Sequence, residues 1–425
     1  MAKASTPKIE KKRLIAAGMI GNVIEWYDFA LYGYMASVIS QLFFPTSDPT
    51  AALIATYGTF AGGFLMRPIG AIVFGHIGDT IGRKPVMVLS VVLMVIPTIL
   101  LGILPTYETW GVWAPVCLVL IRLLQGFSVG GEFSGSVTYL VEACPQNRRG
   151  LAGSWANCGG GMGFFLGAGT PAFLIWLLGD TAIQDYGWRL PFLLGGVIGV
   201  IGLLLRTHLP ELGDPPKDEE KREIPLIRVF REEPRVVLWM LCFTSFYGAA
   251  YYIPIVYMPT WQSLYSDLSL DTALLVMTFA MAFQTLLIPM FAYLTDTVLS
   301  RKATLIAGFV ALGVVAIPFF QIAEGGILWQ VVLVYGVMCV FIGIMLGLVP
   351  TTLVEAFDRR HRLTGYSICF NSGMAIGGGT APMVCTALIQ WTGNKYIPAF
   401  YLAFVCVAAA SVMMLGRDRS KERLR

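Results

Sequence analysis

The chain has 425 residues, a formal net charge of +4 at pH 7, and a composition of 56% hydrophobic and 13% charged residues. Soluble domains carry about 25% charged residues, so this composition excludes an ordinary soluble protein and indicates a chain embedded in a lipid bilayer. The eight cysteines show no CxxC or metal-ligand spacing, and the sequence has no nucleotide-binding loop and no nucleophile–base pattern. We therefore expect neither an enzyme nor a cofactor, and the small net charge gives no reason to expect a nucleic-acid partner.

Hydropathy divides the chain into apolar segments separated by short polar connections. A membrane-crossing helix needs about 20 mostly apolar residues. Twelve segments meet this requirement, which predicts an all-α membrane protein. They are residues 14–44, 51–78, 85–104, 112–143, 150–178, 188–206, 236–262, 271–296, 302–322, 327–357, 363–391 and 397–416. The connector 207–235 is charged and contains proline, so we predict a cytoplasmic linker between a six-helix bundle over 1–206 and a second one over 236–425.

The lysines and arginines predict the orientation of the chain, because cytoplasmic loops are enriched in them. All but four of the 30 lie in the N-terminal tail, the even-numbered connections or the C-terminal tail. The exceptions are Arg189 and Lys395 in odd-numbered connections, and Arg67 and Arg122 inside helices. Both termini are therefore predicted to lie in the cytoplasm.

The two predicted bundles share an internal repeat. The fourth segment ends in TYLVEA at Ala143 and the tenth ends in TTLVEA at Ala356, an offset of 213 residues, and a basic loop follows each. Similarly, GDT around Asp79 and TDT around Asp296 each precede a basic pair. Six crossings return the chain to the same side, so the repeat is parallel, about an axis along the membrane normal.

Several of these motifs resemble those of the major facilitator superfamily. GHIGDTIGRK, beginning at Gly75, resembles its loop between helices 2 and 3, and RLLQG at Arg122 resembles its helix 4 signature. The resemblance implies two six-helix halves that rock about a central site lined by helices 1, 4, 7 and 10. It also implies gating residues at the cytoplasmic helix ends, to which we add Arg67. The predicted gating set is Arg67, Asp79, Arg83, Glu142, Asp296, Arg301 and Glu355.

Further motifs resemble the metabolite:proton symporter family within that superfamily. They are GNVIEWYDF (21–29), FLMRPIG (64–70), QGFSVGGE (125–132) and YGWRLPF (186–192). Within this family, GLAGSW (150–155) and the pair Tyr251-Tyr252 most resemble the proline/glycine-betaine proton symporter branch. The resemblance implies a bacterial inner-membrane protein that imports a small solute together with protons.

Ionisable residues at membrane depth are costly and indicate function. Glu25, Asp28, Arg67, Arg122 and Glu132 have this position, and all belong to the first half. Helical rise places Asp28 near the middle of the bilayer, at a depth compatible with an ion pair between Arg122 and either Asp28 or Glu25. A low-dielectric site favours the neutral form of a carboxyl group. We therefore expect Asp28, Glu25 or Glu132 to carry the proton, with Arg122 then freed to bind a substrate carboxylate; the alternative is a static ion pair.

Aromatic side chains on the first and seventh segments suggest a cation-binding surface. Tyr247 and Tyr251 are four residues apart on one helix face, and Trp26 and Tyr32 lie on the first segment. Aromatic faces attract quaternary ammonium groups, although packing aromatics would give the same pattern. The predicted substrate contacts are Trp26, Tyr32, Arg122, Gln125, Tyr247, Tyr251 and Asn371. By contrast, the stripe Gly159, Gly163, Gly167 is predicted to be a helix-packing surface.

These features together predict a monomeric proton-coupled symporter that imports a small zwitterionic solute of the proline or betaine type by alternating access. A symporter of a di- or tricarboxylate such as 2-oxoglutarate or citrate remains an alternative, because Arg67 and Arg122 would suit a dianion. A non-transporting substrate sensor on the same fold is a second alternative. Such a sensor would be expected to have lost the loop motifs or the intramembrane acids, and this sequence keeps both.

Overall fold

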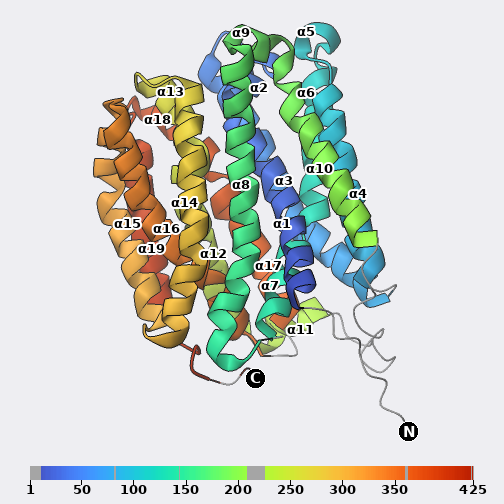
Figure 1. Cartoon of the computed structure of the whole chain (residues 1–425), viewed down its shortest axis with the longest axis vertical. Helices are drawn as coiled ribbons and strands as arrows, with labels where there is room; N and C mark the ends of the chain where they lie inside the picture. Colours follow the sequence, from blue (N-terminus) through green and yellow to red (C-terminus); the bar gives the residue numbers. More distant parts are fainter. Residues whose placement is uncertain are drawn as a thin grey trace.

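The computed structural model in Figure 1 is a bundle of long helices that run between two ends. We call them the α11 end, at the bottom of the figure, and the α5 end, at the top. The structure describes residues 11–80, 83–142, 144–207, 225–358, 362–422 and 424. Within these ranges it does not describe the side chains of residues 11–18, 75–80, 83–87, 139, 180, 205–207 and 225–227.

The first half of the chain forms six helical bodies, several of them built from more than one element. Its helices are α1 (Lys11–Tyr34), α2 (Ala36–Phe43), α3 (Pro49–Thr80), α4 (Arg83–Ile103), α5 (Tyr107–Trp110), α6 (Trp113–Val129), α7 (Glu132–Glu142), η1 (Gln146–Arg148), α8 (Arg149–Leu178), α9 (Asp180–Ala182), η2 (Ile183–Gly187) and α10 (Arg189–Thr207).

The second half repeats this plan after a short helix that lies within the predicted linker. Its helices are α11 (Pro225–Glu232), α12 (Pro234–Tyr252), η4 (Ile253–Tyr257), α13 (Met258–Tyr265), α14 (Leu270–Thr297), α15 (Arg301–Glu324), α16 (Leu328–Ala356), α17 (Arg362–Gly373), η5 (Met374–Gly379), α18 (Ala381–Thr392) and α19 (Ile397–Leu415). Each of the twelve predicted segments coincides with one helical body to within a few residues, so the all-α prediction is confirmed.

Two bodies of the second half contain a π-helical break that the sequence did not predict. In the body that starts with α12, η4 contains Pro254, whose missing N–H removes one bond of the α-helical ladder. In the body that starts with α17, η5 has the sequence MAIGGG and packs tightly on α12. A Cβ on Gly377 would lie 1.7 Å from the backbone oxygen of Ser245, so only glycine permits this approach.

Length and composition fit a membrane-spanning bundle. Within the described ranges, nine helical stretches of 19 to 33 residues have a mean hydropathy of 1.3 to 2.7 and are able to cross a membrane. Their outward faces are apolar, with Trp176, Leu286 and Val314 among the exposed side chains. Large apolar surfaces of this kind are stable only against lipid or another protein.

Helix α8 is central to the packing because it contacts both halves (Figure 1). On one side the predicted glycine stripe faces α1: a Cβ on Gly159 would lie 2.8 Å from Met19 O, and one on Gly163 would lie 2.7 Å from Val23 O. On the other side, a Cβ on Gly161 would lie 2.3 Å from Thr285 Oγ1 of α14. The stripe is therefore a packing surface, as predicted.

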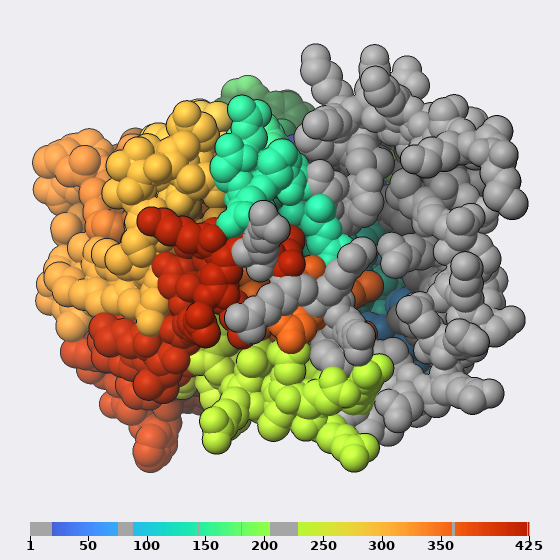
Figure 2. Space-filling model, turned by 90° about the horizontal axis from the view of Figure 1, so that it is seen from below, coloured from blue at the N-terminus to red at the C-terminus, as the bar shows by residue number. Residues whose placement is uncertain are grey.

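The two halves touch at both ends of the bundle. At the α5 end, Tyr57 donates a hydrogen bond of 2.9 Å to Thr260 Oγ1, and Gln390 donates one of 2.9 Å to Asp48. At the α11 end, Figure 2 shows the dark red C-terminal residues lying between the gold second-half helices and green α8. There the C-terminal segment accepts a hydrogen bond of 3.0 Å from Arg149 through the backbone oxygen of Glu422. Contact at both ends describes a closed, occluded arrangement.

Candidate functional site

A buried ion pair joins α1 to α6 inside the first half. Arg122 Nη1 donates to Asp28 Oδ2 at 2.8 Å, and both side chains are at most 2% exposed. The other carboxylate oxygen, Asp28 Oδ1, accepts from Gln125 Nε2 and from Thr98 Oγ1, each at 2.8 Å. The structure thus selects Asp28, not Glu25, as the partner of Arg122. Three donors, from Arg122, Gln125 and Thr98, thus surround the carboxylate of Asp28.

A second buried ion pair lies between α1 and α3. Arg67 Nη1 is 3.4 Å from Glu25 Oε1, and the side chains are 1% and 2% exposed. Charge-assisted N–H···O bonds are usually about 2.7–2.9 Å, so this contact is long. The guanidinium carbon lies 4.1 Å from the ring centroid of Phe64, 4.2 Å from that of Phe29 and 5.2 Å from that of Trp26. Arg67 is therefore a cation surrounded by aromatic rings with a loosely held counter-ion.

Phe29 contacts both arginines. Its ring centroid is 4.2 Å from the guanidinium carbon of Arg67 and 4.6 Å from that of Arg122. The Nε and Nη2 atoms of both arginines have no hydrogen-bond partner among the residues that the structure describes. Buried polar groups are nearly always hydrogen-bonded, so these four donors indicate a place for water or a ligand.

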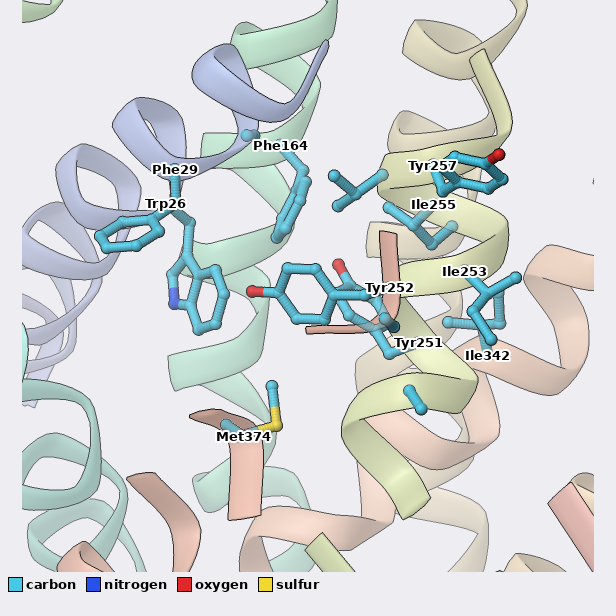
Figure 3. Packing of buried hydrophobic residues seen from close by; sticks show 14 of the residues in the cluster. Trp26, Phe29, Phe164, Tyr251, Tyr252, Ile253, Ile255, Tyr257, Ile342 and Met374 are labelled. Atoms are coloured by element: carbon cyan, nitrogen blue, oxygen red, sulfur yellow. The ribbon is translucent and has the colours of Figure 1, made fainter. Parts of the chain in front are cut away.

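Aromatic residues from both halves meet around Trp26 and Phe164 (Figure 3). Trp26 stacks on Phe164 with ring centroids 5.5 Å apart, and Phe164 meets Tyr251 edge-to-face at 5.5 Å. Phe64 meets Tyr252 at 5.3 Å. Figure 3 shows Tyr251 and Tyr252 extending from α12 toward Trp26 and Phe164. Trp26 Nε1 and the Tyr252 hydroxyl are buried and, within the described part of the chain, have no hydrogen-bond partner.

The α11 end carries two reciprocal ion pairs between the halves. Arg362 Nη1 is 2.6 Å from Glu142 Oε1, and Arg149 Nη1 is 3.5 Å from Glu355 Oε1. Arg149 and Arg362 are 213 residues apart, and so are Glu142 and Glu355. This is the offset of the sequence repeat. The repeat is thus visible as a pseudo-symmetric pair of contacts that hold this end closed.

The predicted gating residues of the second repeat support the same closure. Asp296 accepts hydrogen bonds from the backbone N–H groups of Gly150 and Leu151, at 3.0 and 2.9 Å, at the start of α8. An anion is favourable at a helix N-terminus. Arg301 binds Asp296 at 2.9 Å and Glu355 at 2.5 Å. The side chains of the first-repeat residues Asp79 and Arg83 lie outside the described residues.

The remaining predicted residues occupy varied positions. Tyr32 stacks over Arg122, with 4.4 Å between the guanidinium carbon and the ring centroid. Asn371 bridges the halves by donating to the backbone oxygen of Gly130 at 2.7 Å. Tyr247 is buried and stacks on Phe243, as a packing residue would. The half-buried carboxylate of Glu132 accepts from Ser90 at 3.3 Å.

Sequence reasoning did not identify several residues of this site. Arg149 and Arg362 are spaced by the same offset as Glu142 and Glu355, so the repeat could have indicated them. Thr98 has no such signal, because a threonine in an apolar helix commonly bonds to its own backbone. Thr98 does this as well, donating to Met94 O at 2.9 Å.

Comparisons with known proteins agree with the fold. The Major Facilitator Superfamily pattern matches residues 18–283 and 264–425. The chain is 32% identical to the glycine betaine/proline/ectoine/pipecolic acid transporter of Dickeya dadantii, over 97% of this chain and 85% of that protein. It is 31% identical to the proline/betaine transporter of Escherichia coli K12, over 93% and 81% of the two chains. It is also 34% identical to a putative proline/betaine transporter of Staphylococcus aureus COL, over 94% and 86%.

Among solved structures, a D-xylose–proton symporter superposes with a TM-score of 0.74 at 18% identity, covering 98% of this chain and 100% of that one. Identity this low shows a shared fold alone. The prediction that the chain is a multi-pass membrane transporter and not an enzyme is confirmed by the family match. The protein belongs to the major facilitator superfamily.

Proposed function

We propose that this protein is a proton-coupled symporter that imports a small zwitterionic solute, of the proline or betaine type, by alternating access. The three relatives named above bear the names of proline or betaine transporters, one of them as a putative transporter, with 31–34% identity over nearly the whole chain. The distribution of lysine and arginine supports placing the α11 end and both termini in the cytoplasm of a bacterium. The bundles would then be residues 1–206 and 236–425, with 207–235 as a cytoplasmic linker.

The observation that carries the proposal is the Asp28–Arg122 pair. Asp28 is 2% exposed, and every partner named for it belongs to the first half: Arg122, Gln125 and Thr98. A proton on Asp28 would remove the charge that holds Arg122 and would change the electrostatics of the first half alone. If the proton reaches Asp28 while the site is open to water, proton entry would be coupled to solute entry.

The ion pairs at the α11 end supply the second element of alternating access. Arg149–Glu355 and Arg362–Glu142 join the halves there, whereas the contacts of Tyr57 and Asp48 join them at the α5 end. Opening the α11 end requires the two ion pairs to separate, and opening the α5 end requires the contacts of Tyr57 and Asp48 to separate. A closed arrangement with both sets formed is therefore the intermediate expected between two open states.

One observation favours a second candidate substrate. Arg67 and Arg122 each leave Nε and Nη2 without a partner in the described residues, and both guanidinium groups contact the ring of Phe29. Two open guanidinium edges near one another would suit a dicarboxylate such as 2-oxoglutarate. The nearby carboxylates of Glu25 and Asp28 oppose this alternative, because they would repel a dianion.

The test is solute-driven proton uptake by the purified protein in liposomes, with proline, glycine betaine, 2-oxoglutarate, citrate and shikimate as candidates. External alkalinisation on adding proline or betaine is the expected result. Alkalinisation with a di- or tricarboxylate alone would keep the symporter and change its substrate. Solute binding without any proton or solute movement would favour a sensor instead.

A further inference from the structure

Arg67 presents a directional anion-binding edge at the place where the two halves meet. Its Nε–H and Nη2–H bonds point the same way and form the fork that matches a carboxylate. Both atoms are buried and have no partner among the described residues. The opposite edge, through Nη1, faces Glu25 at 3.4 Å. The pair thus offers one free cationic edge beside one buried anion.

We propose that Glu25 and Arg67 together form the recognition site for the two charges of a zwitterion. This inference rests on the proposed function and names the chemistry of its binding site. The fork of Arg67 binds the substrate carboxylate, and Glu25 faces the substrate ammonium. Trp26 and Tyr252, whose buried N–H and O–H groups lack partners in the described residues, lie close enough to enclose the carbon skeleton.

Arg67 is better placed for this role than Arg122, the residue expected from the sequence. Arg122 Nη1 is held at 2.8 Å by both Asp28 and Gln125, all within the first half. Among the described residues, the ion pair of Arg67 is its long contact with Glu25. Phe64, which covers the guanidinium of Arg67, packs against Tyr252 of the second half. Substrate bound at Arg67 would therefore be enclosed by movement of the second half.

The arrangement also explains selection for a zwitterion. A pure anion would be attracted by Arg67 but repelled by Glu25. A pure cation would be attracted by Glu25 but repelled by Arg67. A zwitterion replaces one long ion pair with two opposite-charge contacts, in a site that is at most 2% exposed. Because unpaired buried charges are costly, both charges of the ligand are needed for tight binding.

The first experiment compares three ligands of nearly equal shape on the unmodified full-length protein. They are L-proline, L-prolinamide, which is a cation, and tetrahydrofuran-2-carboxylate, which is an anion. Competition against radiolabelled proline measures their affinities in detergent. Each analogue should bind about 10- to 100-fold more weakly than proline, since each leaves one buried charge without its partner. Equal affinity of proline and either analogue, or no binding of proline or glycine betaine at all, would overturn the inference.

Two variants then assign the charges. Arg67→Lys keeps the charge but removes the fork, so it should weaken proline and tetrahydrofuran-2-carboxylate about tenfold or more while leaving prolinamide unchanged. Glu25→Gln should weaken proline and prolinamide and leave the anion unchanged or tighter. The matched control is the exposed pair Arg228–Glu232 of α11, 2.8 Å apart, changed to Arg228→Lys and Glu232→Gln with no effect on any ligand.

A purely structural Arg67–Glu25 pair would give a different pattern. Its variants would weaken all three ligands by the same factor, and this result would overturn the inference. If a variant does not yield folded protein, the ligand series on the unmodified chain still decides. Charge-selective binding without proton uptake would refute the proposed symport and keep the site. Proline-driven proton uptake without charge-selective binding would support the proposed symport and refute the Glu25–Arg67 recognition site.

Discussion

Replacing Asp28 by asparagine removes a charge while keeping the shape of the side chain. Asn Oδ1 can still accept from Gln125 and Thr98, which now lie 2.8 Å from Asp28 Oδ1. The amide Nδ2, however, would face Arg122 Nη1, a donor opposite a donor. Arg122 is fully buried, so Asp28→Asn leaves a guanidinium without its counter-ion. Breaking a buried pair in this way costs about 3–5 kcal/mol.

Two measurements separate the effect on stability from the effect on coupling. Thermal unfolding of the purified variant should show destabilisation, and adding Arg122→Gln should recover most of it, because the double variant buries no unpaired charge. In liposomes, Asp28→Asn should not accumulate proline against its gradient under an imposed pH difference. It should still exchange labelled for unlabelled proline, since exchange needs no net proton movement.

The coupling role of Asp28 would be refuted by a variant that accumulates proline to the level of the unmodified protein. A variant that fails in both accumulation and exchange, while retaining a normal unfolding temperature and normal proline binding, would also contradict it. In that case Asp28 would be required for the movement of the halves and not for proton coupling. Equal stability of the single and double variants would contradict the cost assigned to the unpaired guanidinium.

Three further changes test the closure, the packing and the aromatic surface. Glu355→Gln should destabilise the closed α11 end by about 3 kcal/mol, because Glu355 is 3% exposed and lies between two arginines. Glu142→Gln should destabilise it by less than about 1 kcal/mol, because Glu142 is 41% exposed. Hydrogen exchange at the start of α8 would measure both effects. Gly126→Ala should greatly reduce the yield of folded protein, because the added Cβ would lie 1.7 Å from Gly63 O. The control is Gly336→Ala, whose Cβ would have no atom within 4 Å, and it should not change the yield in the same expression assay. Tyr251→Ala should weaken glycine betaine binding by about fivefold or more and 2-oxoglutarate binding much less, and an equal effect on both would argue against a cation–π contact.

The fold could be predicted from the sequence because two of its constraints are purely local. A bilayer fixes the length of each apolar segment, and the predicted segments 271–296 and 397–416 match α14 and α19 within one residue at each end. The repeat likewise follows from spacing alone. The π-helical breaks η4 and η5 were not predictable, because they depend on the packing of a neighbouring helix against specific prolines and glycines.

The sequence singled out the ionisable residues at membrane depth, but it did not determine which of them pair with one another. Glu25 and Asp28 are three residues apart on α1, so their side chains point about 60° from one another around the helix axis. That difference directs Glu25 to α3 and Asp28 to α6, and only the positions of those helices decide which arginine each acid meets. The sequence left both acids open as partners of Arg122 and gave Arg67 no partner at all.

The two ion pairs of α1 need a physical link if proton binding is to affect solute binding, and Phe29 is the residue that touches both. Its ring lies 4.2 Å from the guanidinium carbon of Arg67 and 4.6 Å from that of Arg122, so a shift of Arg122 on protonation of Asp28 would move the ring against Arg67. We predict that Phe29→Leu, which keeps an apolar side chain but removes the flat ring, preserves proline binding and weakens its dependence on pH. Proline affinity measured between pH 5 and 8 tests this. An unchanged pH profile would show that the two pairs are linked by another route, such as the movement of α1 as a whole.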